Sequence, residues 1–105
     1  MPDRDEDTNV ITRPKPKQET ALPKMWAILF VNDDYTPMEF VVYVLVEVLR
    51  VDLDSATRLM LKVHKDGAAK VGRFTRDVAE TKVAQIGALA KLNEHPLNVQ
   101  AVEAD

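Results

Sequence analysis

The sequence has no cysteine, one serine and three glycines, and each shortage excludes a class of chemistry. Without cysteine the chain cannot form disulfides, use a thiol nucleophile or bind zinc through thiolates. The glycines, at positions 67, 72 and 87, are too scattered to build a phosphate-binding loop. The lone serine, Ser55, falls in the first turn of a predicted helix and is a poor candidate nucleophile. These absences already argue against several enzyme classes.

Other missing features concern location and partners. No apolar run approaches the roughly 18 residues needed to cross a bilayer. The segment Met1 to Asp7 is acidic overall, so it lacks the net basic start and the apolar stretch of a secretion signal. The net charge of −3, from 17 acidic and 14 basic residues, does not favour a nucleic-acid binder. We therefore expect a cytoplasmic protein that binds neither nucleic acid nor membrane.

The composition predicts one small domain preceded by an arm. The chain has 105 residues, of which 46% are hydrophobic and 30% charged, as in ordinary globular proteins. Residues 1–23 hold four of the six prolines and only five apolar residues. Such a segment buries too little apolar surface to offset its ordering entropy, so we expect a flexible arm, either a dispensable tail or a tether for a partner. Residues 24–105 have the composition of a folded domain.

The first half of this domain is expected to form a strand and two helices. An apolar run from Met25 to Val31 favours a strand because of its length and its aromatic and β-branched content. Thr36 to Glu39 has the pattern of a capping box, with Thr36 as N-cap and Pro37 in the first turn of a helix that reaches Leu49. A second helix is expected between an Asp52 cap and a left-handed stop at Gly67.

The second half predicts a strand, a helix and a final strand. Ala68 to Phe74 fits a short strand, and Thr75 can cap a third helix that ends before Pro96. Val99 to Glu103 alternates apolar with polar residues, as a half-exposed strand does. The order β-α-α-β-α-β predicts an α+β fold with the helices packed on one face of a sheet whose pairing is mixed or antiparallel.

Four polar residues look unlike ordinary surface: Asn32, Asp33 and Asp34 at the first strand-to-helix corner, and His64 on the second helix. These residues could also have purely structural roles. The corner side chains could bond to the backbone of a turn, and His64 could stabilise the C-terminus of its helix. Placed together, an amide oxygen, a carboxylate and an imidazole would form an acceptor-rich cup for an ammonium group.

Two methionines extend this hypothesis, although core packing would also explain them. Met38 follows the corner, and Met60 lies one helical turn before His64. Methionine lines adaptable apolar pockets, so the combination fits a peptide N-terminus followed by a bulky apolar side chain. A metal-dependent hydrolase would use the same carboxylates, but those of Asp33 and Asp34 should diverge because the residues are consecutive. We expect no catalysis, no cofactor and no metal.

One longer pattern is specific. The segment Val31 to Val41 reads VNDDYTPMEFV, and further motifs span residues 56–64, 78–83 and 93–97. Together they resemble the ClpS family, the adaptors that deliver N-end-rule substrates to the ClpA unfoldase of the ClpAP protease. The resemblance covers residues 24 to about 100 and implies a three-stranded antiparallel sheet with three helices on one face.

The resemblance also implies roles for single residues. Asn32, Asp33 and His64 match the family's ligands for the substrate α-amino group. The first substrate side chain, which is Leu, Phe, Tyr or Trp, would enter a pocket in which Met38 is the gatekeeper against β-branched residues. The residues matching the wall of that pocket are Asp34, Thr36, Met38, Val41, Met60, Val63 and Leu97.

A second region resembles part of the family's face for docking to a ClpA-type AAA+ unfoldase: Glu80, Thr81 and Lys82, with Asp77 where some relatives carry glutamate. The arm over residues 1–23 would be the element that the unfoldase engages. The main alternative is another interaction domain with the related fold of the ribosomal stalk protein, in which an acidic pocket facing Asn32 would be absent.

Overall fold

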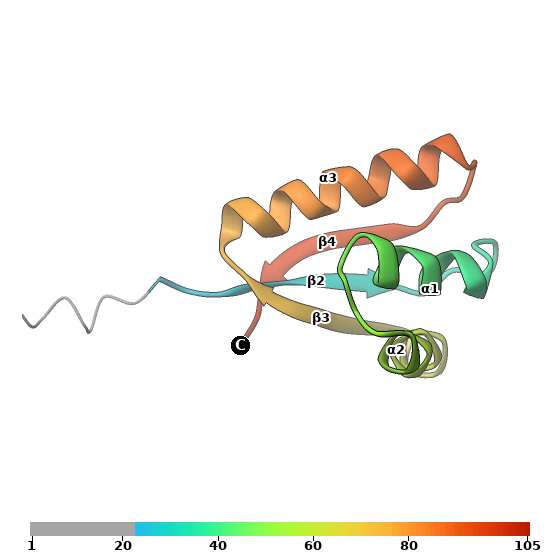
Figure 1. Ribbon diagram of the computed structural model, residues 1–105, viewed down its shortest axis with the longest axis horizontal. Coiled ribbons are helices and arrows are strands. Elements are labelled where there is room, and N and C mark those ends of the chain that lie inside the picture. The colour runs from blue at the N-terminus through green and yellow to red at the C-terminus, as the bar shows by residue number, and fades with distance from the viewer. Residues whose placement is uncertain (1–22) are drawn as a thin grey trace, which may run out of the picture.

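A computed structural model describes residues 23–105 of the chain (Figure 1). The predicted arm over residues 1–23 lies outside the described residues except for Pro23, so it stays a prediction. The described elements follow the predicted order β-α-α-β-α-β, which is confirmed. They are β2 (Trp26–Val31), α1 (Met38–Glu47), α2 (Leu53–Asp66), β3 (Ala68–Phe74), α3 (Arg76–Leu92) and β4 (Asn98–Glu103).

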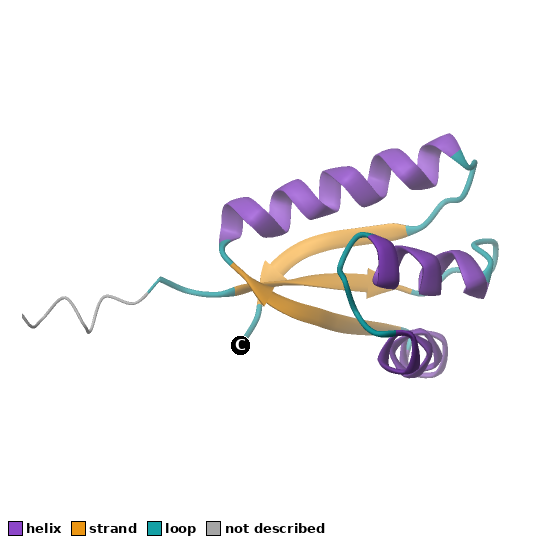
Figure 2. Ribbon diagram, viewed as in Figure 1, coloured by secondary structure: helices purple, strands orange, loops and turns teal. Residues whose placement is uncertain are grey.

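The three described strands form one antiparallel sheet in the order β3-β2-β4, as the family resemblance implied (Figure 2). The central strand β2 is therefore hydrogen-bonded on both sides. Alternate residues of a strand point to opposite faces, so one face of each strand can be apolar. The residues that pair across the sheet on its inner face are Ile28, Phe30, Ala69, Val71, Val99 and Ala101.

The helices pack on this inner face and enclose the core. Ile28 and Phe30 of β2 are fully buried, together with Val44 and Leu45 of α1 and Ile86 of α3. α3 runs along β4, and α2 lies beside β3 with α1 packed against it (Figure 1). The fold is thus a two-layer α+β arrangement, with the helices packed on one face of the sheet.

The predicted capping box at the start of α1 is wrong. The helix begins at Met38, and its N-cap is Pro37, which has no side chain able to cap. The Thr36 hydroxyl instead donates to the Asp33 carboxylate at 2.8 Å, so it is not available to the helix. The chain uses Thr36 to close the preceding loop, and the amides of Phe40 and Val41 in the first turn of α1 donate to the Pro37 carbonyl.

Both predicted ends of α2 and the predicted start of α3 are confirmed. The Asp52 side chain accepts from the Ser55 amide at 3.0 Å at the start of α2, and Gly67 ends that helix with φ 90°. Glycine suits this left-handed position because it has no Cβ to clash. The Thr75 side chain caps α3 as predicted.

The end of α1 differs from expectation. The helix stops at Glu47, before the expected Leu49, and Arg50 then adopts φ 60°. The carbonyl of Val48 accepts a partly buried hydrogen bond of 3.1 Å from Lys82 Nζ on α3. This contact joins residues 34 positions apart, so it could not be predicted from local sequence patterns.

Candidate functional site

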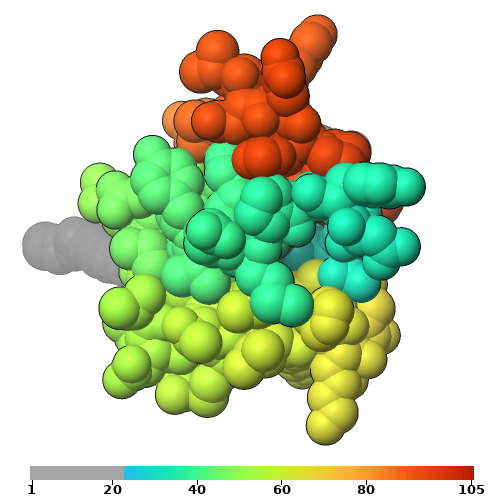
Figure 3. Space-filling model, turned by 90° about the vertical axis from the view of Figure 1, so that its right-hand side faces the viewer, coloured from blue at the N-terminus to red at the C-terminus, as the bar shows by residue number. Residues whose placement is uncertain are grey.

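A cavity of about 270 Å³ lies where the loop after β2 meets α1 and α2, at the end of the molecule that Figure 3 faces. Every residue that the sequence assigned to the amino-group ligands and the pocket wall lines it. Val31, which the sequence analysis did not include, also lines it, and its place directly before Asn32 is the signal that could have found it. The full lining is Val31, Asn32, Asp33, Asp34, Thr36, Met38, Val41, Met60, Val63, His64 and Leu97.

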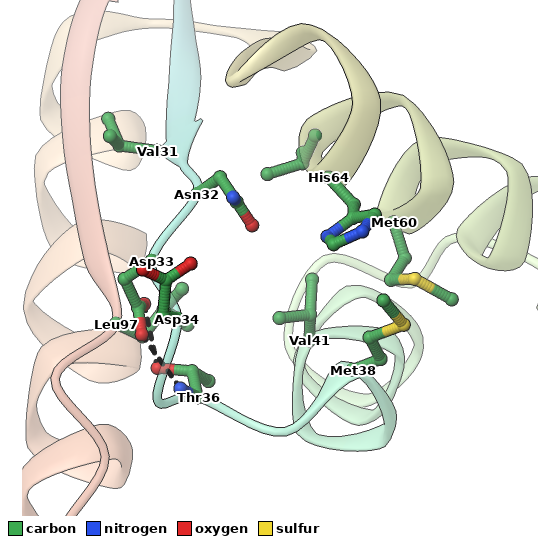
Figure 4. A pocket seen from close by; sticks show the side chains of 11 residues that line it. Val31, Asn32, Asp33, Asp34, Thr36, Met38, Val41, Met60, His64 and Leu97 are labelled. Atoms are coloured by element: carbon green, nitrogen blue, oxygen red, sulfur yellow. Dashed lines mark hydrogen bonds between the residues drawn. The ribbon is translucent and has the colours of Figure 1, made fainter.

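One backbone contact brings the two polar sides of this cavity together. The Asn32 amide donates to the Gly67 carbonyl at 2.9 Å, which ties the start of the loop to the end of α2. His64 lies in the last turn of α2, close to that tie. The side chains of Asn32 and His64 consequently face each other across the cavity (Figure 4). An amide oxygen and an imidazole nitrogen can both accept hydrogen bonds from a guest placed between them.

The Asp33 carboxylate is partly engaged by its own loop. Its Oδ1 accepts from the amides of Tyr35 at 2.8 Å and Thr36 at 2.7 Å, and its Oδ2 accepts from the Thr36 hydroxyl at 2.8 Å. Partial burial opposes ionisation of this carboxyl, but the three donors and the charge of nearby His95 together hold the pKa of Asp33 below its ordinary value. Because a carboxylate has about four acceptor positions, one position on Oδ2 stays open.

The neighbouring carboxylate has a different environment. Asp34 is exposed, and within residues 23–105 its side chain accepts no hydrogen bond. The side chains of the two consecutive acids thus diverge, as their spacing predicted. Asp33 accepts the hydrogen bonds of the loop, whereas Asp34 lines the cavity with an exposed carboxylate. Both place negative charge beside Asn32.

The other half of the cavity is apolar. Val41 of α1, Val63 of α2 and Leu97 of the segment before β4 are buried, with 7%, 4% and 9% of their surfaces exposed. Met38 and Met60 lie beside each other on the helix side of the cavity (Figure 4), and Met38 is 42% exposed. Flexible thioether side chains at such a rim can adapt to different guests. The cavity therefore has a corner rich in hydrogen-bond acceptors beside an apolar floor.

The predicted docking residues lie apart from this cavity, on α3. Asp77, Thr81 and Lys82 line a separate hollow of about 190 Å³. Glu80 does not line that hollow, and its carboxylate pairs with Arg76 at 3.1 Å. Lys82 is partly committed to the Val48 carbonyl. The four residues share one helix but differ in how freely they can meet a partner.

Within residues 23–105, no three His, Asp or Glu side chains gather closely enough to hold a metal ion. Over the same span, the helices are too short or too polar to cross a bilayer.

Comparison with known proteins decides the family. A model of the family described as ATP-dependent Clp protease adaptor protein ClpS matches residues 21–100. The chain belongs to the ClpS family. It is therefore a member of the Clp protease adaptors, and the ribosomal-stalk alternative has no support from this match.

Individual relatives agree with this assignment. An ATP-dependent Clp protease adapter protein ClpS from Brucella canis is 52% identical over 90 residues, which cover 86% of this chain and 76% of that protein. The ClpS 1 adapter of Agrobacterium fabrum is 50% identical over 90 residues, with 86% and 75% covered. Among solved structures, Agrobacterium tumefaciens ClpS2 bound to L-phenylalaninamide is 39% identical with a TM-score of 0.75, and the match covers 78% of this chain and 99% of that one.

Proposed function

We propose that this ClpS-family chain binds proteins that begin with a free α-amino group and a bulky hydrophobic residue, Leu, Phe, Tyr or Trp, and delivers them to a ClpA-type AAA+ unfoldase of the ClpAP protease. The observation that carries the proposal is the shared cavity, in which Asn32 and His64 face each other beside an apolar floor. One end of that cavity suits an ammonium group, and the other suits an apolar side chain.

The ammonium group needs several acceptors at once. A protonated α-amino group offers three donors and no acceptor. In the proposal, Asn32 and a neutral His64 accept two of its hydrogen bonds, and the open position on Asp33 takes part while both Asp33 and Asp34 supply negative charge. Each charge-assisted hydrogen bond contributes about 1.5–3 kcal/mol.

The first side chain of the substrate contributes a comparable binding free energy. Burying a Leu or Phe side chain against Val41, Val63 and Leu97 contributes roughly 1.5–3 kcal/mol. After the cost of association, a dissociation constant near the micromolar level follows, which corresponds to about −8 kcal/mol. An affinity of this size selects a substrate and still permits its transfer.

Selection of chain termini follows from the amine. An internal leucine offers a single uncharged N–H, so the acceptors of the cavity would stay poorly paired. The ClpS2 neighbour supports this mode, because the L-phenylalaninamide bound to it carries a free α-amino group and an aromatic side chain. The activity proposed is binding in the cytoplasm, with no catalytic step, no cofactor and no metal, and without nucleic acid or membrane as partners.

Delivery requires a second surface. We assign it to the α3 residues Asp77, Glu80, Thr81 and Lys82, with the arm over residues 1–23 as the segment that the unfoldase engages. This assignment is supported by the family match and by the separation of these residues from the cavity lining.

The experiment that tests the proposal compares two peptides that differ only in whether the N-terminal amino group is free. Fluorescence anisotropy should give a dissociation constant near micromolar for a Leu-initiated peptide. An N-acetylated copy of that peptide should lose binding, because it has no ammonium group. Equal affinity for the free and acetylated peptides would refute the proposed recognition of the amine.

A further inference from the structure

A second hollow, of about 580 Å³, opens where the end of α1 meets α3. We call it the α1–α3 groove. It shares no lining residue with the site cavity. Val48, Ala88, Leu89 and Leu92 give it an apolar lining, and Leu92 is 79% exposed. An exposed leucine next to such a groove is apolar surface that a partner can cover.

Arg50 lines the same groove in an unusual backbone conformation. Its φ of 60° lies in the left-handed region, where a Cβ is unfavourable and glycine is the usual residue. Within residues 23–105 its guanidinium makes no ion pair or hydrogen bond. Strained positions in native proteins concentrate at functional sites. The chain thus places a cation, without a described partner, where the backbone favours glycine.

The groove is continuous with the predicted docking residues. Lys82 and Gln85 line it, and they also line the smaller hollow formed by Asp77 and Thr81. The bond from Lys82 Nζ to the Val48 carbonyl holds the end of α1 against α3, so the two hollows share a fixed wall. One partner seated on the α3 docking residues would therefore reach the groove.

We propose that the α1–α3 groove is the second half of the unfoldase-docking surface. It receives an apolar side chain of the unfoldase on Leu89 and Leu92, and a neighbouring carboxylate of the unfoldase pairs with Arg50. Glu47 lies on the same rim and makes no ion pair with Arg50, so the cation is available to the partner. This inference rests on the proposed delivery function and names residues beyond the α3 docking set.

The test measures the affinity of the full chain for the ClpA-type unfoldase in solution, with peptide affinity measured in parallel. Arg50→Gly removes the cation and relieves the backbone, so we expect an unchanged or higher melting temperature with unfoldase affinity at least fivefold weaker. Leu92→Ala should weaken unfoldase binding to a similar degree. Leu61→Ala, at a 50% exposed leucine of α2 outside the groove, is the matched control and should bind as the natural chain does.

A third variant separates this inference from the delivery proposal. Thr81→Arg places a bulky cation on the α3 docking residues and should abolish unfoldase binding. If it does so while Arg50→Gly and Leu92→Ala stay within twofold of the natural chain, the groove inference is overturned and delivery through α3 stands. If all three variants bind normally, docking on α3 fails and the groove inference fails with it. Equal losses of peptide and unfoldase binding in Arg50→Gly would also overturn it.

Discussion

The Thr36 hydroxyl donates a hydrogen bond of 2.8 Å to the Asp33 carboxylate and so closes the loop that leads from β2 into α1. The same carboxylate accepts the amides of Tyr35 and Thr36. Asp33 therefore has two tasks in the proposed function: its charge attracts the substrate amine, and its acceptors hold the loop that carries Asn32.

Removing Asp33 should cost most of the peptide affinity. Asp33→Ala deletes a carboxylate and three internal hydrogen bonds, so we expect about 10- to 100-fold weaker binding of a Leu-initiated peptide, the equivalent of about 1.5–3 kcal/mol. Circular dichroism should show a folded domain. Asp54→Ala, which removes an exposed acid from the first turn of α2, is the control. Affinity like that of the natural chain would refute the acidic corner.

The lowered pKa of Asp33 predicts how its contribution to stability depends on pH. Because the donors from its loop lower the pKa in the folded state, ionised Asp33 stabilises the fold above the unfolded pKa, which is about 3.9. That contribution is lost as pH falls through the lower, folded value. The melting temperature of Asp33→Asn should therefore lie below that of the natural chain at pH 7, and the gap should narrow below about pH 4. A gap that is equal at pH 7 and pH 2 contradicts this account.

The imidazole of His64 should supply one acceptor for the substrate amine, because its side chain faces Asn32 across the cavity. His64→Ala removes that acceptor, so we expect about 10-fold weaker binding of a Leu-initiated peptide. His64→Gln, which keeps an acceptor, should lose less affinity. Fluorescence anisotropy measures both variants, and affinity like that of the natural chain in His64→Ala would exclude this role.

Met38 should control which first residues are admitted. It lies exposed at the rim, and shortening it to alanine widens the entrance. We expect Met38→Ala to bind peptides that begin with Ile or Val, with the affinity for Leu changed far less. A peptide array with all twenty first residues measures this. Met25→Ala, outside the cavity lining, is the control, and unchanged discrimination by Met38→Ala would mean that Met38 only packs.

Two glycines offer a matched test of the fold. A Cβ at Gly72 would clash with the ring of Phe74, and the φ of 78° disfavours any other residue. Gly72→Ala should therefore destabilise the domain by about 1–3 kcal/mol. Gly87 lies within α3 with nothing within 4 Å of its Cβ position, so Gly87→Ala should stabilise by about 0.4–1 kcal/mol. Urea unfolding measures both, and a stabilising Gly72→Ala would contradict the clash with Phe74.

The sequence predicted elements better than it predicted contacts. The start of α2 at Asp52 and its stop at Gly67 follow from local side-chain and backbone chemistry, so they could be predicted. The role of Thr36 could not be predicted, because its hydroxyl could bond either to the start of α1 or to the preceding loop. In the folded loop it donates to the Asp33 carboxylate. The early end of α1 is accompanied by a left-handed Arg50 and a contact from the distant Lys82, and neither residue is a stop signal in sequence.

The candidate site shows the same division. The residues around the cavity could be named from sequence because the family motif is long and specific. The spacing predicted that the side chains of Asp33 and Asp34 diverge, but it could not predict which of the two the loop binds. The two acids are distinguished only by the donors that the folded loop directs at Asp33. Lys82 was predicted to dock a partner, whereas its bond to Val48 depends on how two helices pack.

The place of β2 in the middle of the sheet has a mechanical consequence. Lys24 leads directly into β2, and the loop of the candidate site follows directly after it, so the two lie at opposite ends of one strand. A force applied through the residues before Lys24 would pull β2 along its own axis, against ladders on both flanks. Such a force loads many of the inter-strand hydrogen bonds at once instead of breaking them one at a time. We therefore expect the domain to unfold slowly under this force, because forced unfolding is governed by the unfolding rate. An unfoldase that pulled on this end of the domain would first load β2, the strand that is hydrogen-bonded on both sides.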